Sequence, residues 1–432
     1  MFAVAIAALM LGYPVAFTLG AIAMLFGGLA LGFDFFSLLP LRIWGVLTNF
    51  TLLAVPLFVF MGVILEKSGI AEKLLETMAM LCGRVRGGLA FAVVLVGALL
   101  AATTGVVGAT VVTLGIIALP AMLNRGYSPS LASATVATAG TLGQVIPPSI
   151  VLILLADVVG VPIGSLFMAA IVPGFILIVL YCLYIATKAW LDPLSAPAIA
   201  VEPDQRIFRR VITSLVPPLF LIVAVLGSIF FGIASPTESA AIGGFGALIL
   251  AATNRRLNVR MIHEAATQTM KLTSMVFIIL IGATAFGLVF KGMGGDRLVH
   301  DIFVALPGAQ WSFLLVSQTI IFVLGFFLDF VEICFIVVPI LTPIASALGL
   351  DLLWFALLIA VNLQTSFLTP PFGFSLFYLK AVAPNTVKIQ QIYRGVIPFV
   401  LIQLLTLAII ATFPEIVRWL PELMDRINGI PS

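Results

Sequence analysis

Two segments of the sequence, 223 residues apart, collect oxygen groups that suit a dehydrated sodium ion. Each segment centres on a Pro-Pro pair, Pro147-Pro148 in the first and Pro370-Pro371 in the second. Proline cannot continue the hydrogen bonding of a helix, so carbonyl oxygens upstream of each pair lose their donors. Hydroxyl residues stand beside both pairs: Thr141, Ser149, Thr365, Ser366 and Thr369. The pattern predicts two broken helices with ion-binding oxygens at equivalent places. The alternative is that the hydroxyls bond back to their own helices and the prolines only make kinks.

Two acidic residues, Asp329 and Glu332, interrupt an apolar stretch at 313–346. A carboxylate deep in a membrane is costly, so a functional role is the default hypothesis for it. The alternative is a structural pair with a Lys or Arg side chain. Glu332 has a further alternative, which is to cap the helix that follows it.

A second long apolar stretch, 89–123, is interrupted by Thr103, Thr104 and Gly105, which offer two hydroxyls and a flexible backbone. Both stretches, at about 35 residues, are too long for one ordinary crossing, which needs about 20. We therefore predict two helical hairpins that enter the membrane, turn and return on the same side. The alternative for each is a pair of tightly packed short spans.

The composition places the whole chain in a membrane. Hydrophobic residues make up 62% of the sequence and charged residues 9%, and the mean hydropathy is +1.25. These values exclude a soluble globular protein. We predict an all-α polytopic fold with spans at 3–32, 50–66, 130–158, 163–187, 212–233, 236–252, 272–290, 353–380 and 396–413. The amphipathic segment 70–86 is expected to lie at the cytoplasmic interface or to act as a connector.

The positive charges set the predicted orientation. A cytoplasmic N-terminus places 16 of the 21 Lys and Arg residues in the cytoplasm, which is the side they favour. The C-terminus is then periplasmic, and the two hairpins open to opposite sides. The two halves therefore read as inverted repeats, which let one fold present a site to either side of the membrane.

This organisation divides the chain into five parts. They are N-terminal scaffold helices at 1–49, a first repeat at 50–187, a linker with two scaffold spans at 188–272, a second repeat at 273–413 and a tail at 414–432. Each repeat contains one hairpin (89–123 or 313–346) and one broken helix (130–158 or 353–380).

Enzymatic motifs are incomplete or missing from the sequence. His263-Glu264 begins a HExxH zinc motif, but residue 267 is a threonine, so the second histidine ligand is lacking. The sequence contains no GxxxxGK[ST] loop and no GxSxG motif. We predict no enzymatic activity and no cofactor.

Several motifs together resemble the large membrane subunit of tripartite ATP-independent periplasmic (TRAP) transporters. The likeness covers nearly the whole chain, and the motifs that carry it are Pro56–Gly62, Thr104–Thr110, Arg125–Tyr127, Gly143–Ser149, Ser235–Glu238, Asp329 and Thr369–Gly373. The resemblance implies sodium-driven uptake of organic acids, dicarboxylates among them, across a bacterial inner membrane by an elevator mechanism. It also implies two partners, which are a periplasmic solute-binding protein and a small four-helix membrane subunit.

The resemblance further implies which residues bind sodium and solute. One sodium site would use Thr104, Gly105, the Val106 backbone, Gly143 and Pro148; the other would use Asp329, Ser366 and Thr369. Thr103, Thr104, Ser149, Asp329, Thr365 and Gly373 would contact the solute. Two positions depart from the family pattern, because Val106 replaces a serine and Ser366 replaces a glycine.

Two other functions remain open at the level of sequence. One is a stand-alone ion- or proton-coupled carboxylate transporter or exchanger that needs no binding protein. The other is a passive channel, since channels also use broken helices and loops at membrane depth. Neighbouring genes for a binding protein and a four-span protein would favour the tripartite transporter, and flux without saturation would favour the channel.

Overall fold

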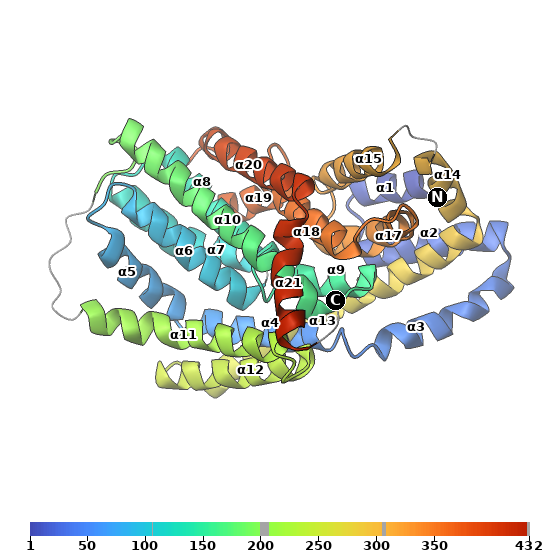
Figure 1. Ribbon diagram of the computed structural model, residues 1–432, viewed down its shortest axis with the longest axis horizontal. Helices are drawn as coiled ribbons and strands as arrows, with labels where there is room; N and C mark the ends of the chain where they lie inside the picture. The colour runs from blue at the N-terminus through green and yellow to red at the C-terminus, as the bar shows by residue number, and fades with distance from the viewer. Residues whose placement is uncertain (106, 199–206, 305–307, 430–432) are drawn as a thin grey trace.

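The computed structural model describes residues 1–105, 107–198, 207–304 and 308–429. Within these ranges every regular element is helical, which confirms the predicted all-α class, and the helices form an elongated array (Figure 1). Six of the described helices are long and apolar enough to cross a membrane, or seven spans if one bent pair counts as a single crossing.

The N-terminal segment forms two helices rather than the single span predicted at 3–32. They are α1 (Phe2–Met10) and α2 (Val15–Ala30), followed by a 3-10 turn (Phe33–Leu38) and α3 (Leu39–Leu47). Between α1 and α2, Gly12 adopts a left-handed φ of 84° and Pro14 stands at the N-cap of α2. Both residues break a helix locally, and the surrounding apolar run hides the break from a hydropathy reading.

The first half contains seven helices, and two of its junctions matter for the site. The helices are α4 (Ala54–Lys67), α5 (Ile70–Cys82), α6 (Gly88–Thr104), α7 (Val107–Asn124), α8 (Pro129–Thr141), α9 (Ile150–Val159) and α10 (Ile163–Leu191). α6 and α7 pack against each other on either side of Gly105. α8 continues into a 3-10 turn (Leu142–Gln144), and the Pro147-Pro148 pair, a cis peptide, separates that turn from α9.

The remaining helices comprise two linker helices, the second half and a C-terminal helix. They are α11 (Ile207–Phe230), α12 (Pro236–Thr253), α13 (Val259–Gly292), α14 (Gly295–Val304), α15 (Ala309–Leu324), α16 (Phe330–Glu332), α17 (Val338–Ala347), α18 (Leu352–Leu368), α19 (Phe374–Val382), α20 (Ile389–Thr412) and α21 (Glu415–Ile427). A π-helical turn (Ile333–Val337) joins α16 to α17 without a break. The second Pro-Pro pair, Pro370-Pro371, also a cis peptide, separates α18 from α19.

Two helices, α5 and α21, are amphipathic, and the sequence pattern predicts only the first of them. α5 meets α4 at 60°, and its apolar residues Leu74 and Leu75 are buried while Glu72 and Glu76 are exposed. α21 lies within the segment 414–432, which the sequence pattern predicts to be a C-terminal tail. It packs against α10 and buries Val417 and Met424. The position of α5 at the membrane interface stays a prediction.

The two predicted broken helices lie at the centre of the fold. Every described residue from Leu131 to Thr141 of α8, and from Trp354 to Leu368 of α18, is buried. α8 contacts α6, α7 and α20, and α18 contacts α15 and α20. Small residues let these helices approach closely; a Cβ at Gly140 would collide with Val111 of α7. The irregular backbone at the first break is largely enclosed by protein, whereas Pro371 and Phe372 at the second break are exposed.

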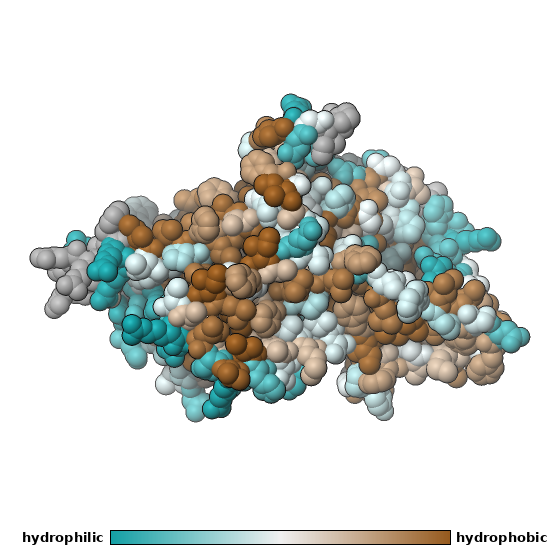
Figure 2. Space-filling view, turned by 90° about the horizontal axis from the view of Figure 1, so that it is seen from below, coloured by the Kyte–Doolittle hydropathy of each residue, from teal (hydrophilic) through white to brown (hydrophobic). Residues whose placement is uncertain are grey.

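The outer surface is apolar over a wide area. Figure 2 shows hydrophobic side chains across much of the face seen from below, and large side chains such as Phe220 and Phe245 are exposed. Such a surface suits contact with lipid. Helix α12 packs on α4, α4 packs on α13, and α13 packs on α2, while α6, α7 and α8 pack together elsewhere. The inversion of the two halves and their division into scaffold and moving parts stay predictions.

Candidate functional site

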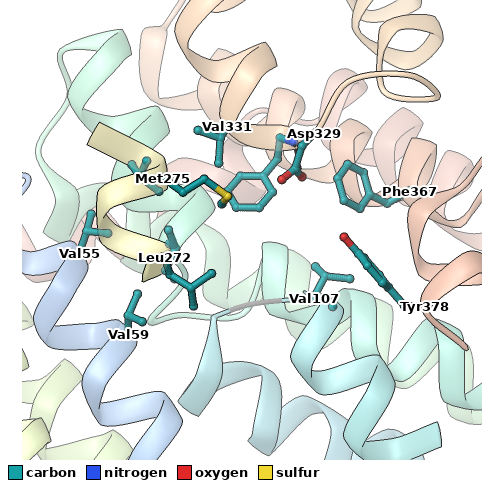
Figure 3. Close-up of a pocket in the computed structure, with 13 residues that line it drawn as sticks. Val55, Val59, Val107, Leu272, Met275, Asp329, Val331, Phe367 and Tyr378 are labelled. Atoms are coloured by element: carbon teal, nitrogen blue, oxygen red, sulfur yellow. Dashed lines mark hydrogen bonds between the residues drawn. The ribbon is translucent and has the colours of Figure 1, made fainter. Parts of the chain in front are cut away.

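A cavity of about 260 Å³ lies where both interrupted stretches and both broken helices meet α4 and α13 (Figure 3). Its thirteen lining residues are Val55 and Val59 of α4, Val107 and Gly108 of α7, Ile150 of α9, Leu272, Met275 and Val276 of α13, Asp329, Phe330 and Val331, Phe367 of α18, and Tyr378 of α19. Residues from seven separated parts of the sequence therefore surround one space.

Asp329 is the acidic residue of this cavity, and it also caps the helix that begins at Phe330. Its Oδ1 accepts a hydrogen bond from the Phe330 backbone N–H at 2.7 Å. In Figure 3 its carboxyl group and the hydroxyl of Tyr378 face the same space, with the Phe367 ring beside them. No ion pair of Asp329 with a Lys or Arg is found among the described residues, so the structural-pair alternative has no support there.

Glu332 turns back onto the backbone instead of lining the cavity. Its Oε2 accepts a hydrogen bond from the Asp329 backbone N–H at 3.0 Å, and the two residues form a capping box. A capping box satisfies two N–H groups that a helix start leaves without partners. The structure therefore shows the capping role that the sequence left open for Glu332.

The turn of the first hairpin depends on Gly105. Gly105 has a φ of 60°, and a Cβ placed on it would lie 3.2 Å from the Ile150 backbone nitrogen. A left-handed φ and a close approach to another backbone both call for glycine. Gly105 thus brings the first tip against the start of α9. Val106 and the side chains of Thr103 and Thr104 lie outside the described part of the chain, so their predicted roles stay predictions.

At the first break, Ser149 satisfies a carbonyl that the prolines set free. Its Oγ donates to the Gln144 carbonyl oxygen at 3.0 Å. Ser149 is also the N-cap residue of α9, but its side chain makes no capping hydrogen bond there. Among the described residues, no side-chain hydrogen bond to the first turn of α9 is found. Gly143 is buried against Ala101 of α6, so the first break also contacts the first hairpin.

At the second break the predicted hydroxyls bond to their own helix. Thr365 donates to the Val361 carbonyl at 2.8 Å, Ser366 to the Leu363 carbonyl at 2.9 Å, and Thr369 to the Thr365 carbonyl at 2.7 Å. This is the back-bonding alternative, and it holds for all three hydroxyls. Each oxygen keeps lone pairs that a cation can use, so the bonds do not exclude a ligand role.

Two contacts at the second break were not predicted from the sequence. Ser375 donates to the Phe367 carbonyl at 2.7 Å, as Ser149 does to the Gln144 carbonyl. Gly325 lies so close to Ser366 that a Cβ on it would collide with the Ser366 Oγ. Ser366 therefore touches the second hairpin just before its turn, as Gly143 touches the first.

The amides near the second break serve helix packing. The Asn362 Nδ2 donates to the Gln318 carbonyl of α15 at 2.6 Å, and the Gln364 Nε2 donates to the Tyr181 hydroxyl of α10 at 3.4 Å. Neither amide lines the cavity.

Of the predicted site residues that the structure describes, Asp329 alone is among the thirteen that line the cavity. The other predicted site residues that the structure describes lie at the turns around the cavity. Gly105 touches Ile150, Gly373 lies close to the Phe367 backbone, and Ser366 touches Gly325. Tyr378, which brings a hydroxyl into the cavity, was missed. The sequence does contain a signal for it: Tyr378 is an aromatic residue with a polar hydroxyl group, and it lies in the helix that follows the break at Gly373.

The described residues contain no group of three or more His, Cys, Asp or Glu side chains placed to hold a metal ion.

Comparison with known proteins gives the family. Residues 2–416 match the family described as "Tripartite ATP-independent periplasmic transporter, DctM component". The chain belongs to this family. It is therefore a TRAP transporter large membrane subunit and a multi-pass inner-membrane permease, as the motifs indicated.

Similar proteins differ in the solutes for which they are named. The C4-dicarboxylate TRAP transporter large permease protein DctM of Pseudomonas aeruginosa is 31% identical over 387 residues, which cover 89% of each chain. The sialic acid TRAP transporter large permease protein SiaM of Vibrio cholerae is 28% identical over 418 residues, 95% of each chain. These near-equal identities do not choose between the two kinds of solute.

A solved structure shares the fold. The Alcanivorax borkumensis YdaH transporter superimposes with a TM-score of 0.66 over 95% of this chain and 98% of its own, at 16% sequence identity. At that identity the likeness extends to the fold alone.

Proposed function

We propose that this TRAP permease takes up an organic acid into the bacterial cell and that an inward sodium gradient drives the transport. The single observation that carries the proposal is the cavity at the junction of both hairpin turns and both broken helices, with Asp329 in its wall. Interrupted helices in repeated halves mark the binding site of secondary transporters.

Sodium would bind beside the cavity at the two breaks. The first site would use Thr104, Gly105, the Val106 backbone, Gly143 and Pro148, and the second Asp329, Ser366 and Thr369. The back-bonded hydroxyls of Ser366 and Thr369 are already oriented by their hydrogen bonds to the helix. A bound cation next to Asp329 would neutralise the carboxylate before the acid arrives. This order of binding ties solute uptake to sodium.

The solute would lie between the tips, where Thr103, Thr104, Ser149, Asp329, Thr365 and Gly373 are the expected contacts. The part formed by both hairpins and both broken helices would then slide across the bilayer against a scaffold that includes α4 and α13. The cavity is lined by residues of both sets of helices, which supports the proposal, since its walls would separate when one set moves. In this arrangement the N-terminus is cytoplasmic and the C-terminus periplasmic.

Two partners complete the transporter. A periplasmic binding protein would deliver the acid, and a small four-helix membrane subunit would brace the scaffold. The word "tripartite" in the family description supports a complex of three components. The competing proposal is a stand-alone ion- or proton-coupled carboxylate transporter or exchanger that needs no binding protein.

Reconstitution separates these proposals. Proteoliposomes with this chain, its small subunit and its binding protein should accumulate the acid that the binding protein captures, and only when sodium is higher outside. Omission of the binding protein is the matched control and should abolish uptake. Accumulation that persists without sodium and collapses with a protonophore would reject sodium coupling, and full uptake without the binding protein would favour the stand-alone transporter.

A further inference from the structure

Two acidic residues that the proposed site does not use, Glu66 and Asp157, lie where the scaffold meets the moving part. Glu66 is in the last turn of α4, and Asp157 is in the last turn of α9. Among the described residues neither carboxylate forms an ion pair with a Lys or Arg side chain. Both stand at the ends of predicted membrane segments, 50–66 and 130–158, where an acidic residue without a cationic partner calls for a role.

Helix α4 lies between the two parts. It packs against α12 and α13, which we assign to the scaffold together with α4. It also packs against α6 of the first hairpin and α9 of the first broken helix, which belong to the moving part. When the moving part slides, its helices must therefore change their position along α4, and side-chain bonds between the two parts must break.

One such bond lies just before the start of α4. The Asn49 Nδ2 donates a hydrogen bond to the Asp157 Oδ1 at 2.6 Å. The side-chain carbonyl of Asn49 accepts a hydrogen bond from the Thr51 backbone N–H at 2.9 Å, and this bond points the amide N–H at the carboxylate. Hydrogen bonds to a charged acceptor are stronger than those between neutral groups. Asn49 therefore holds the end of α9 against the scaffold.

A second bond lies at the other end of α4. The Thr113 Oγ1 of α7 donates a hydrogen bond to the Glu66 Oε1 at 2.9 Å. The next residue, Lys67, instead pairs with Glu264 of α13 at 3.0 Å. Two neighbours on α4 therefore bond in different directions, since Glu66 contacts the moving part and Lys67 contacts the scaffold.

These two boundary hydrogen bonds, Asn49–Asp157 and Thr113–Glu66, exist only in the arrangement that the structure describes. The 14 residues of α4 separate them by about 20 Å, so they fix the moving part at two distant points. Hydrogen bonds hold only over donor–acceptor distances of about 2.7–3.2 Å. A slide along α4 by a single helical turn, about 5.4 Å, would break both.

Both bonds can open and form again. The two carboxyl residues are partly exposed, so water can replace the lost donors. Asp157 also lies in the wall of a cleft of about 800 Å³, which Thr51 and Glu238 line from the scaffold side. Separation therefore does not leave a buried charge without partners, which would be strongly unfavourable.

We propose that Asp157 and Glu66 are positioning residues, which hold the moving part against α4 in one of its two arrangements through the boundary hydrogen bonds. They set the ratio of the two arrangements and do not contact the solute. This inference rests on the proposed function, because it requires that the first hairpin and the first broken helix slide against α4.

Distances between spin labels on the two parts test the inference. Ile116→Cys of α7 and Ile242→Cys of α12 place one label on each part, at side chains that are exposed. The natural Cys82, Cys182 and Cys334 are replaced by serine. The complex of this chain with its small subunit, in lipid nanodiscs with sodium chloride, is measured by double electron–electron resonance. Each arrangement gives its own distance, and the peak areas give the ratio of the two.

Removal of the boundary hydrogen bonds, one at a time, should change this ratio. Asp157→Ala and Thr113→Val each remove one bond. Each should lower the ratio of the described arrangement to the other about tenfold, because hydrogen bonds to charged groups are among the stronger ones. The two sites share no partner, so the double variant should combine the effects to about a hundredfold.

Glu264→Gln is the matched control. It weakens the ion pair with Lys67, which is the neighbour of Glu66 but bonds within the scaffold. The ratio should stay within about twofold of the parent, since exposed ion pairs contribute little. A shift as large as that of Asp157→Ala would show that any polar change beside α4 alters the ratio, and it overturns the inference.

Asn49→Ala removes the first boundary hydrogen bond from the scaffold side, and it serves alone if Asp157→Ala does not fold. It should shift the ratio as much as Asp157→Ala does. The combination of the two should cause no further shift, because both remove the same bond. Shifts that simply multiply would show that the two residues act separately, and they overturn the role of this pair.

The same distances keep the inference apart from the proposed function. Two distances in the parent, with a ratio that Asp157→Ala and Thr113→Val leave unchanged, overturn the inference and still support the elevator movement. One distance in the parent and in every variant contradicts the elevator movement and overturns the inference with it. One distance in the parent and a second that emerges in the variants supports both.

Discussion

The two hairpin turns occupy similar places around one cavity, yet they differ in chemistry. The first turn rests on Gly105, whose backbone lies against the start of α9. The second has Asp329 and Glu332, whose carboxylates cap the helix that starts at Phe330. One turn thus packs its backbone against a neighbouring helix start, whereas the other caps its own helix start with carboxylates. The two turns border the same space with different chemistry.

The two breaks show a related difference. The carbonyl groups of Gln144 and Phe367 are 223 residues apart, and each accepts a hydrogen bond from a serine hydroxyl. The two serines, Ser149 and Ser375, are not 223 residues apart. The same backbone requirement is therefore met by serines at different distances from the two carbonyls.

The largest expected effect separates the two acids of the second turn. Asp329→Ala removes the acidic group of the cavity, and we expect a loss of about 3 kcal/mol, or roughly a hundredfold, in sodium-driven uptake. Glu332→Gln retains an oxygen for the Asp329 N–H and should stay within about threefold of the parent. The measurement is initial uptake in proteoliposomes at equal amounts of folded protein. Near-normal uptake by Asp329→Ala, or an equal loss in Glu332→Gln, would contradict the assignment.

The next effect tests the first turn. Gly105→Ala forces alanine into a left-handed φ, which costs about 1–2 kcal/mol, and places a Cβ against Ile150. We expect uptake to fall about tenfold. Gly160→Ala is the control, because Gly160 has a φ of 80° and nothing near its would-be Cβ. It should lower only the thermal stability. Equal losses of uptake in the two variants would show that backbone strain alone, and not the contact with α9, explains the effect.

A smaller effect, on the sodium dependence of uptake, tests Ser366, the predicted sodium ligand that touches the second hairpin. Ser366→Ala should raise the sodium concentration for half-maximal uptake about fivefold, since a hydroxyl ligand contributes about 1 kcal/mol. Thr342→Ala removes a hydroxyl with the same back-bond, to the Val338 carbonyl, outside the cavity. Sodium dependence should not change in that control. An unchanged dependence in Ser366→Ala would remove Ser366 from the sodium site.

The smallest effect compares the two breaks directly. Ser149→Ala and Ser375→Ala each leave one buried carbonyl without its hydroxyl partner. We expect each to lower the free energy of unfolding by about 1 kcal/mol, and by similar amounts. Thermal unfolding of the purified variants measures both. A large effect at one break and none at the other would show that the two serines are not equivalent in function.

Features set by local chemistry could be predicted from the sequence. Proline chemistry located the interruptions at Pro147-Pro148 and Pro370-Pro371, and the cost of a buried carboxylate pointed to Asp329. Features set by packing could not. Tyr378 reaches the cavity, and Gly325 meets Ser366, only because distant helices come together. The break at Pro14 was missed because the apolar run continues across it, and α21 was missed because its helix forms against α10.

The measurement that tests the central claim most directly is labelling of a cavity residue from each side of the membrane. Tyr378→Cys, with the natural Cys82, Cys182 and Cys334 replaced by serine, is reacted with a membrane-impermeant maleimide in sealed vesicles of known orientation. The account predicts that the cavity opens alternately to the two sides of the membrane, so that the cysteine can be labelled from each side. Sodium and solute should change the ratio of the two labelling rates. Labelling from one side alone under every gradient would contradict it.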